Sequence, residues 1–128
     1  MNAAVYLRVS TEEQATSGYG LDAQQEKVMA MAIVKGWTIT NTYTDDVSGT
    51  KDRTQRPGLD AMLNAACSGK VGAVIVAALD RLGRSTRIVL DVAEQLDKCG
   101  AELVSCKESI DTTTASGRFV FRMFASLA

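Results

Sequence analysis

The fold of this chain is constrained most by an alternation of apolar runs with amphipathic helical patterns, each closed by a glycine. Gly36, Gly69 and Gly100 stand at these boundaries, and glycine readily adopts the left-handed backbone conformation that ends helices. The predicted helices start near Asp22, at Pro57 and near Thr86 and run to these glycines, and the predicted strands are 3–9, 37–43, 72–79 and 101–106. Strand–helix units repeated in this way predict an α/β fold, a mostly parallel central sheet flanked by helices on both faces.

The apolar patterns also predict which side chains are buried. Strands 3–9 and 72–79 are almost wholly apolar, as in strands that helices cover on both sides. On the second strand, Trp37, Ile39 and Tyr43 are expected to share one face. On the second helix, the expected buried face consists of Leu59, Met62, Leu63, Ala66 and Cys67.

Length and composition indicate one domain that spans residues 1–128. Hydrophobic residues make up 46% and charged residues 23% of the chain, which excludes a disordered tail. No apolar run approaches the roughly 20 residues of a membrane span, and the N-terminus carries no signal-peptide pattern. Cys67, Cys99 and Cys106 cannot all pair and lack CxxC spacing, so we expect reduced core thiols, a cytoplasmic protein and no zinc site.

The chain contains no histidine, which excludes serine–histidine triads and histidine-ligated metals. Its net charge of −1 gives no general attraction to nucleic acid. The charge is unevenly distributed, however, because residues 51–87 carry seven basic and three acidic side chains. This segment therefore predicts a local anion site within a nearly neutral domain.

The last segment, 116–128, is expected to be a helix with Phe119, Met123 and Leu127 on one apolar stripe. Val120 and Phe124 lie beside that stripe. Phe121 falls off it. One interpretation is a terminal helix packed on the sheet. The other is an interface helix whose apolar surface belongs to another subunit, in which case the chain is a fragment ending within that helix.

Polar residues at the carboxyl ends of the predicted strands define the candidate site, because ligands of open parallel sheets bind at that edge. The first strand ends with Arg8 and Ser10, the second with Asp45 and Asp46, and the third leads into Asp80, Arg81 and Arg84. Gln14, Gln24, Arg53 and Arg56 are expected to reach the same crevice. Arginines around one serine suit a phosphate, since guanidinium donates two parallel hydrogen bonds to its oxygens. A carboxylate, a water molecule or a phosphate oxygen could accept the serine proton.

Other interpretations of these residues remain open. Singly, Arg8 could pair with an acid, Ser10 could cap a turn, and Asp80 could be a helix N-terminal acid. The Asp45–Asp46 pair could hold a divalent metal or form an acidic phosphoacceptor pocket. The run Gly18-x-Gly20-x-x-Ala23 matches the dinucleotide-binding fingerprint, although a polar loop separates it from the first strand. A nucleotide-binding α/β domain is therefore an alternative function.

Several motifs resemble the serine recombinase (resolvase/invertase) family. The run Tyr6-Leu7-Arg8-Val9-Ser10-Thr11, then Gln14 and Leu21-Asp22-Ala23-Gln24, is similar to the opening of that family's N-terminal catalytic domain. Tyr43-Thr44-Asp45, Ser48-Gly49, Arg56-Pro57-Gly58-Leu59 and Leu79-Asp80-Arg81-Leu82-Gly83-Arg84 resemble its later motifs, and 108–117 resembles the lead into its interface helix. The longer loop from Ser10 to Leu21 is most similar to the large serine recombinases and integrases.

The resemblance implies a resolvase-like fold with flavodoxin-like layering and a C-terminal interface helix. It also implies cleavage of double-stranded DNA at recombination sites, with Ser10 as nucleophile and a 5′-phosphoserine intermediate. Arg8, Arg81 and Arg84 would clamp the phosphate with Arg56 assisting, and Asp80 would donate a proton or organise the site. Tyr6, Gln14, Gln24, Asp45 and Ser48 would support it. No metal or cofactor is implied, and the full-length protein would form dimers and tetramers.

Two departures from the family pattern bear on this expectation. Many members carry a lysine just before the Leu79-Asp80-Arg81 motif, where this chain has Ala77-Ala78. The family's interface helix also continues beyond Ala128 and is followed by DNA-binding domains, which this chain does not contain. A catalytically inactive oligomerisation module of the same fold is therefore a further alternative.

Overall fold

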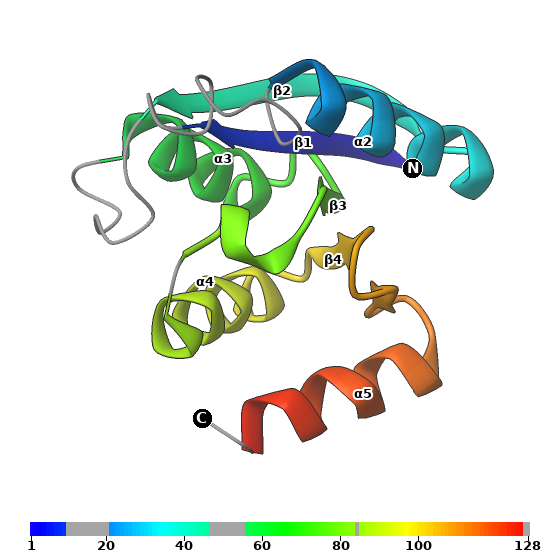
Figure 1. Cartoon of the computed structure of the whole chain (residues 1–128), viewed down its shortest axis with the longest axis vertical. Helices are drawn as coiled ribbons and strands as arrows, with labels where there is room; N and C mark the ends of the chain where they lie inside the picture. The colour runs from blue at the N-terminus through cyan, green and yellow to red at the C-terminus, as the bar shows by residue number, and fades with distance from the viewer. Residues whose placement is uncertain (10–20, 47–55, 84, 127–128) are drawn as a thin grey trace.

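The computed structural model describes residues 1–9, 21–46, 56–83 and 85–126 (Figure 1). The elements along the described chain are β1 (Asn2–Val9), α2 (Leu21–Lys35), β2 (Thr38–Asp46), α3 (Pro57–Cys67), β3 (Ala73–Val76), the 3-10 helix η2 (Leu79–Arg81), α4 (Thr86–Lys98), β4 (Glu102–Ser105), β5 (Ile110–Asp111) and α5 (Ala115–Ser126). The strands form one sheet of order β2-β1-β3-β4-β5, in which only the β4–β5 pair is antiparallel. The predicted α/β fold is confirmed. The two-residue β5 was not predicted, because it is too short to show an alternating pattern.

Helices cover both faces of the sheet, and each face has its own core (Figure 1). α2 packs over one face, where the buried residues include Val5 and Leu7. α3 and α4 pack over the other, where they include Tyr6, Leu63 and Leu96. Successive β1 side chains alternate between the two cores, as the pleat of a strand requires. Burial on both faces explains why β1 is so uniformly apolar.

The register of β2 against β1 corrects one predicted face. Between Ile39 and Asn41 the pairing skips Thr40, which is an extra residue in β2. One extra residue turns the side chains that follow to the opposite face. Ile39 accordingly packs with Trp37 on the α2 side, whereas Tyr43 packs on the α3 side. The prediction that Trp37, Ile39 and Tyr43 share a face is therefore wrong.

The predicted helix ends are confirmed. Gly36, Gly69 and Gly100 have φ of 71°, 81° and 76°, a backbone conformation that other residues rarely adopt. Pro57 is the first residue of α3. At the start of α4, the Ser85 hydroxyl accepts a hydrogen bond from the Ile88 N–H at 3.2 Å, so it caps that helix.

The third strand is shorter than the predicted span 72–79. It ends at Val76, and the chain turns into η2 from Leu79. Leu79 is still buried in the α3–α4 core. Its apolar character therefore reflects burial in a turn, which apolar patterning alone does not distinguish from a continuing strand.

The cysteines also differ from the prediction. Cys67 and Cys99 form a disulfide with a Cα–Cα distance of 4.7 Å, which joins the end of α3 to the C-cap of α4. Cys67 is exposed and does not lie on the buried face of α3. The two helices run side by side and end together, which brings residues 32 apart in sequence into bonding distance. Cys106 is free and half-buried.

α5 contacts the rest of the domain through β5 and through Phe121, which packs against the α3–α4 core. Phe119, Val120 and Met123 are exposed. The residue that falls off the predicted stripe is thus the packed one, and the described stripe residues face outward. Leu127, the third residue of that stripe, lies outside the described residues. Within the described chain, no helix combines the length and apolar character needed to cross a membrane.

Candidate active site

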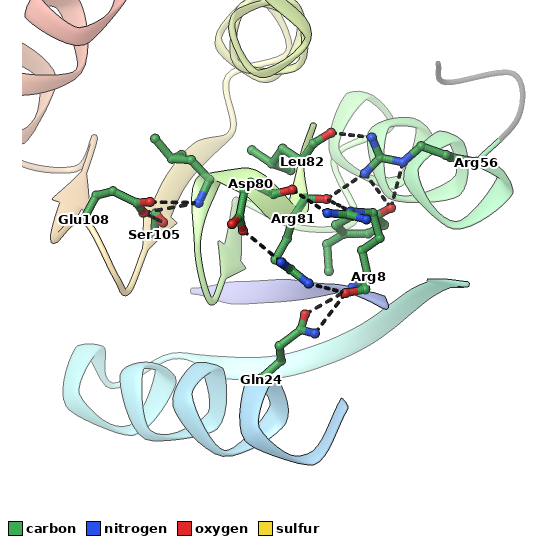
Figure 2. Close-up of polar contacts among 10 residues, drawn as sticks. Arg8, Gln24, Arg56, Asp80, Arg81, Leu82, Ser105 and Glu108 are labelled. Carbon is green, nitrogen blue, oxygen red and sulfur yellow. Dashed lines mark hydrogen bonds and ion pairs between the residues drawn. The ribbon is translucent and has the colours of Figure 1, made fainter. Parts of the chain in front are cut away.

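The site lies at the carboxyl ends of β1 and β3, which are neighbours in the sheet although α2, β2 and α3 separate them in the chain. The chain passes from β1 to β2 on one side and later to β3 on the other, so this edge is a topological switch point. Figure 2 shows Arg8 from β1, Arg56 before α3, and Asp80 and Arg81 of η2 converging there. The predicted convergence of these side chains is therefore found in the structure.

Arg8 is the central residue of the cluster and is 2% exposed. Its Nε donates to the Arg81 carbonyl at 3.2 Å and its Nη2 to the Asp80 carbonyl at 2.8 Å. These bonds tie the end of β1 to η2. They also satisfy part of a buried guanidinium with carbonyl oxygens, which do not cancel its charge.

Gln24 joins α2 to the same strand end. Its side-chain amide donates to the Arg8 carbonyl at 2.9 Å and accepts from the Arg8 N–H at 3.2 Å. The Gln24 side chain thus bonds both backbone groups of Arg8, as a neighbouring strand would (Figure 2). Gln24 is 3% exposed, so α2 is anchored where β1 leads into Ser10 in the sequence.

Arg81 and Asp80 form an ion pair within η2. Arg81 Nε donates to Asp80 Oδ1 at 2.9 Å, and Arg81 Nη1 donates to the Arg8 carbonyl at 3.0 Å. Burial by itself disfavours the charged carboxylate, but the Arg81 hydrogen bond and the charges of Arg81, Lys107 and Arg8 hold the pKa of Asp80 below its usual range. Asp80 is therefore an ionised acceptor that orients Arg81.

Arg56 is fully buried and spans the gap between β1 and η2. It donates to the Tyr6 hydroxyl at 2.8 Å, to the Arg81 carbonyl at 2.7 Å and to the Leu82 carbonyl. Its guanidinium carbon lies 5.4 Å from the centroid of the Tyr6 ring. Arg56 thus positions the backbone of η2, on which Arg81 is mounted.

Asp45 organises the second half of this network. It accepts from the Tyr6 hydroxyl at 2.6 Å and from the N–H groups of Gly58 and Leu59 at 2.7 and 2.8 Å, and so caps the N-terminus of α3. A Cβ on Gly58 would lie 2.8 Å from both Asp45 Oδ1 and the Thr44 carbonyl, so only glycine allows this approach. Burial and the Asp45 hydrogen bond raise the pKa of Tyr6 far above its usual range.

The extra residue in β2 explains why Asp45 reaches this position. Asp45 follows Tyr43 by two residues and shares its face, the α3 side of the sheet. Without Thr40 as an additional residue, Asp45 would point toward α2 instead. A local irregularity at one end of β2 therefore determines the cap of α3 at the other.

Glu108 and Ser105 contribute contacts to the site that the sequence did not predict. Glu108 accepts from the Leu79 N–H at 3.2 Å and from the Ser105 hydroxyl, and so holds the start of η2 (Figure 2). Both follow or end β4, the fourth strand of the parallel set. The strand-end rule, extended to that strand, would have identified them.

Several predicted site residues lie outside the described residues: Ser10, Gln14, Gly18, Gly20, Ser48, Arg53 and Arg84. Ser10 follows Val9, the last residue of β1, in the sequence. Asp46 is described and exposed, beside the buried Asp45. No group of three metal-ligating side chains is found in the part of the chain that the structure describes.

In chemical terms, this is a rigid, arginine-rich site. Within the described residues, three buried arginines share a hydrogen-bonded network with the carboxylates of Asp45 and Asp80, and Glu108 brings a third carboxylate to the start of η2. No described buried side-chain polar atom lacks a hydrogen bond, which keeps the arginines in place before any ligand arrives. A preorganised set of guanidinium groups stabilises added negative charge on a phosphoryl group.

Comparison with known proteins points to one family. The family described as "Resolvase, N terminal domain" matches residues 3–128. The Tn917 transposon resolvase of Enterococcus faecalis is 31% identical over 123 residues, which cover 96% of this chain and 59% of that protein. The DNA-invertase of Enterobacteria phage P7 is 37% identical over 123 residues, with 96% and 58% covered. This chain therefore spans less than two thirds of either relative.

A solved structure gives the same result. The N-terminal catalytic domain of TP901-1 integrase superimposes with a TM-score of 0.89 and 33% sequence identity. The match covers 99% of this chain and 93% of that domain. The similarity therefore extends over the whole sheet, its helices and the candidate site.

Proposed function

Because this chain belongs to the resolvase family of serine recombinases, matching its N-terminal domain over residues 3–128, we propose that it cleaves and rejoins DNA with Ser10 as the nucleophile. The observation that carries the proposal is the interlocked cluster of Arg8, Arg56 and Arg81 at the strand end that leads into Ser10. The whole protein's substrate is double-stranded DNA with recombination sites, on which it works as dimers and tetramers.

The proposed reaction is a transesterification. The Ser10 oxygen forms a bond to phosphorus while the bond from phosphorus to the 3′ oxygen breaks. This leaves a 5′-phosphoserine and a free 3′-hydroxyl. The serine proton passes to an acceptor, and the departing 3′ oxygen gains a proton. Religation is the same step in reverse, so the phosphoester bond is conserved without a nucleotide cofactor.

Each supporting residue has a proposed role that its contacts favour. Arg8 and Arg81, with Arg84, neutralise the non-bridging oxygens, since guanidinium stays charged and offers paired donors. Asp80 organises Arg81, in keeping with its depressed pKa. Positioning is the proposed role of the remaining residues, Tyr6, Gln24, Asp45 and Arg56 by their contacts and Gln14 and Ser48 by their place in the motifs.

The test is a covalent-adduct assay on the complete polypeptide that carries this chain. It is incubated with DNA from the edges of its own genetic element and quenched in denaturant. We expect an adduct at the 5′ phosphate that maps to Ser10, is abolished by Ser10→Ala and survives Ser68→Ala. Ser68 is an exposed serine in the turn after α3, at the opposite edge of the sheet.

The contrary outcomes are informative. An adduct formed by the Ser10→Ala protein would exclude Ser10 as the nucleophile. DNA binding without any adduct would favour the alternative of an inactive oligomerisation module. In that case, Ala78→Lys would be the next variant to examine.

A further inference from the structure

A cavity of about 150 Å³ opens beside the active-site cluster, on the α2 side of η2. Its walls include Lys27 of α2, Asp80 and Arg81 of η2, and Lys107 from the turn between β4 and β5. Asp80 and Arg81 belong to the active-site cluster, whereas Lys27 and Lys107 have no role in the proposed cleavage reaction. A water molecule occupies roughly 30 Å³ in the liquid, so the cavity has room for a phosphate group with its hydration.

Small side chains leave this space open. Ala77 and Ala78, which connect β3 to η2, line it and are both buried. Neither side chain extends into the cavity beyond its Cβ. Lys27 and Lys107, which also line the cavity, are both exposed.

Lys107 reaches the cavity from a firmly anchored turn. Its own N–H donates to the Ala77 carbonyl at 2.9 Å, and the Cys106 N–H donates to the Val76 carbonyl at 3.0 Å. Glu108 accepts from the Leu79 N–H at 3.2 Å. These three bonds hold the backbone around Lys107 against the end of β3 and the start of η2.

The walls carry a net positive charge. Among the described residues that line it, Lys27, Arg81 and Lys107 are basic and Asp80 is acidic. A second cavity, between α4 and α5, is lined among the described residues by three acidic and two basic side chains and has the opposite sign. Burial raises the pKa of Asp80, but the hydrogen bond and charge of Arg81 and, after them, the charge of Lys107 lower it, so the Lys107 charge acts on this wall of the cavity. An anion is the ligand that this charge pattern favours.

We propose that this cavity binds a DNA backbone phosphate next to the one that is cleaved, with Lys27 and Lys107 as its cationic ligands. The assignment rests on the proposed function. Arg81 supplies the link, because it lines the cavity and also belongs to the arginine cluster at the cleavage site. An anion in the cavity therefore lies close to the reacting phosphate. On a DNA strand, the anion closest to the cleaved phosphate is the phosphate of the adjacent linkage.

The test measures DNA binding in the Ser10→Ala background of the complete polypeptide, so that cleavage does not interfere. Each protein–phosphate contact releases counterions and contributes about 0.9 to the slope of log K against log salt concentration. We expect Lys27→Ala and Lys107→Ala each to lower that slope by about 0.9, and the double variant by about 1.8. Lys107→Arg should keep the slope. Lys70→Ala should also keep it, since Lys70 is exposed at the opposite edge of the sheet.

A second measurement locates the phosphate. One backbone linkage at a time is replaced by a neutral methylphosphonate on either side of the cleaved bond. At the proposed linkage, the methylphosphonate should lower the DNA affinity of the parent protein but not that of Lys107→Ala. The DNA change and the protein change then remove the same contact. At other linkages, the two losses should add.

Unchanged salt slopes in the lysine variants, or additive losses at every linkage, would overturn the assignment. A covalent adduct in the parent protein would in that case leave the proposed function standing. The anion could also come from free phosphate and not from DNA. Stability measurements with inorganic phosphate at constant ionic strength distinguish these two sources. If inorganic phosphate stabilises the parent but not Lys107→Ala, while the DNA slopes are unchanged, the cavity is a free-phosphate site and the DNA assignment is wrong.

Discussion

At the scale of single residues, Asp45 connects more parts of the site than any other carboxylate described above. It caps α3 and fixes the Tyr6 hydroxyl, and Tyr6 in turn accepts from Arg56. The neighbouring Asp46 is exposed. The two adjacent acids therefore provide a matched pair for separating a structural carboxylate from a solvated one.

We expect Asp45→Ala to lower the free energy of unfolding by about 2–4 kcal/mol, because it removes a helix cap and leaves buried donors unpaired. Asp46→Ala should change it by no more than about 0.5 kcal/mol. Urea denaturation followed by circular dichroism measures both. Equal, small effects of the two substitutions would show that Asp45 does not hold α3.

At the scale of elements, α3 and α4 matter because their N-terminal ends adjoin the site and their C-terminal ends are joined by the Cys67–Cys99 disulfide. Arg56 precedes α3, and η2 leads into α4. The two helices therefore act as one unit whose far end is covalently closed. That closure removes conformational freedom from the unfolded chain.

For a sequence separation of 32 residues, chain entropy predicts that reduction costs about 3–4 kcal/mol of stability. The measurement is the urea midpoint of the oxidised and the reduced protein. Cys67→Ser should lower the midpoint to the reduced value and make it insensitive to reductant. Cys106→Ser should keep the full response to reductant, and the disulfide would have no stabilising role if the two midpoints coincided.

At the scale of the whole molecule, the Lys35–Asp111 ion pair ties the end of α2 to β5, the last strand of the sheet. Lys35 also donates to the Thr113 hydroxyl at 3.1 Å, and its ammonium lies 5.0 Å from the Trp37 ring centroid. Burial disfavours the Asp111 carboxylate, but hydrogen bonds from Lys35 and Thr113 outweigh this and lower its pKa.

This pKa shift predicts a pH dependence of stability. A carboxyl whose pKa is lower in the folded than in the unfolded protein stabilises the fold above the unfolded value, about 3.9. That contribution is lost as pH falls through the folded value. The difference in unfolding free energy between wild type and Asp111→Asn should therefore be full near neutral pH and fade below about pH 4.

A charge-partner control tests the same prediction. In a Lys35→Met background, the difference in unfolding free energy between the Asp111 protein and Asp111→Asn should largely disappear. In a Lys70→Met background it should persist, because Lys70 lies in an exposed turn. A difference that stays constant down to the lowest pH would contradict the coupling of Asp111 to Lys35.

The sequence by itself determined the α/β class, three helix ends and the convergence of Arg8, Arg56, Asp80 and Arg81 at one edge. These follow from local preferences of glycine and proline, from apolar periodicity and from a general rule of parallel sheets. The motifs also indicated the resolvase family before the comparisons with known proteins established it. The assignment of roles to Ser10, Gln14, Ser48 and Arg84 stays a prediction.

Only the tertiary structure decided which long-range partners these residues find. The extra residue Thr40 turned Asp45 toward α3, and the adjacent C-terminal ends of α3 and α4 brought Cys67 to Cys99. The β4–β5 turn brought Lys107 to the same cavity as Asp80. None of these has a local signature, because each depends on register or packing between segments distant in sequence. Sequence patterns predict which residues are buried and where helices and strands end. Contacts between side chains of different elements form only when those elements pack together.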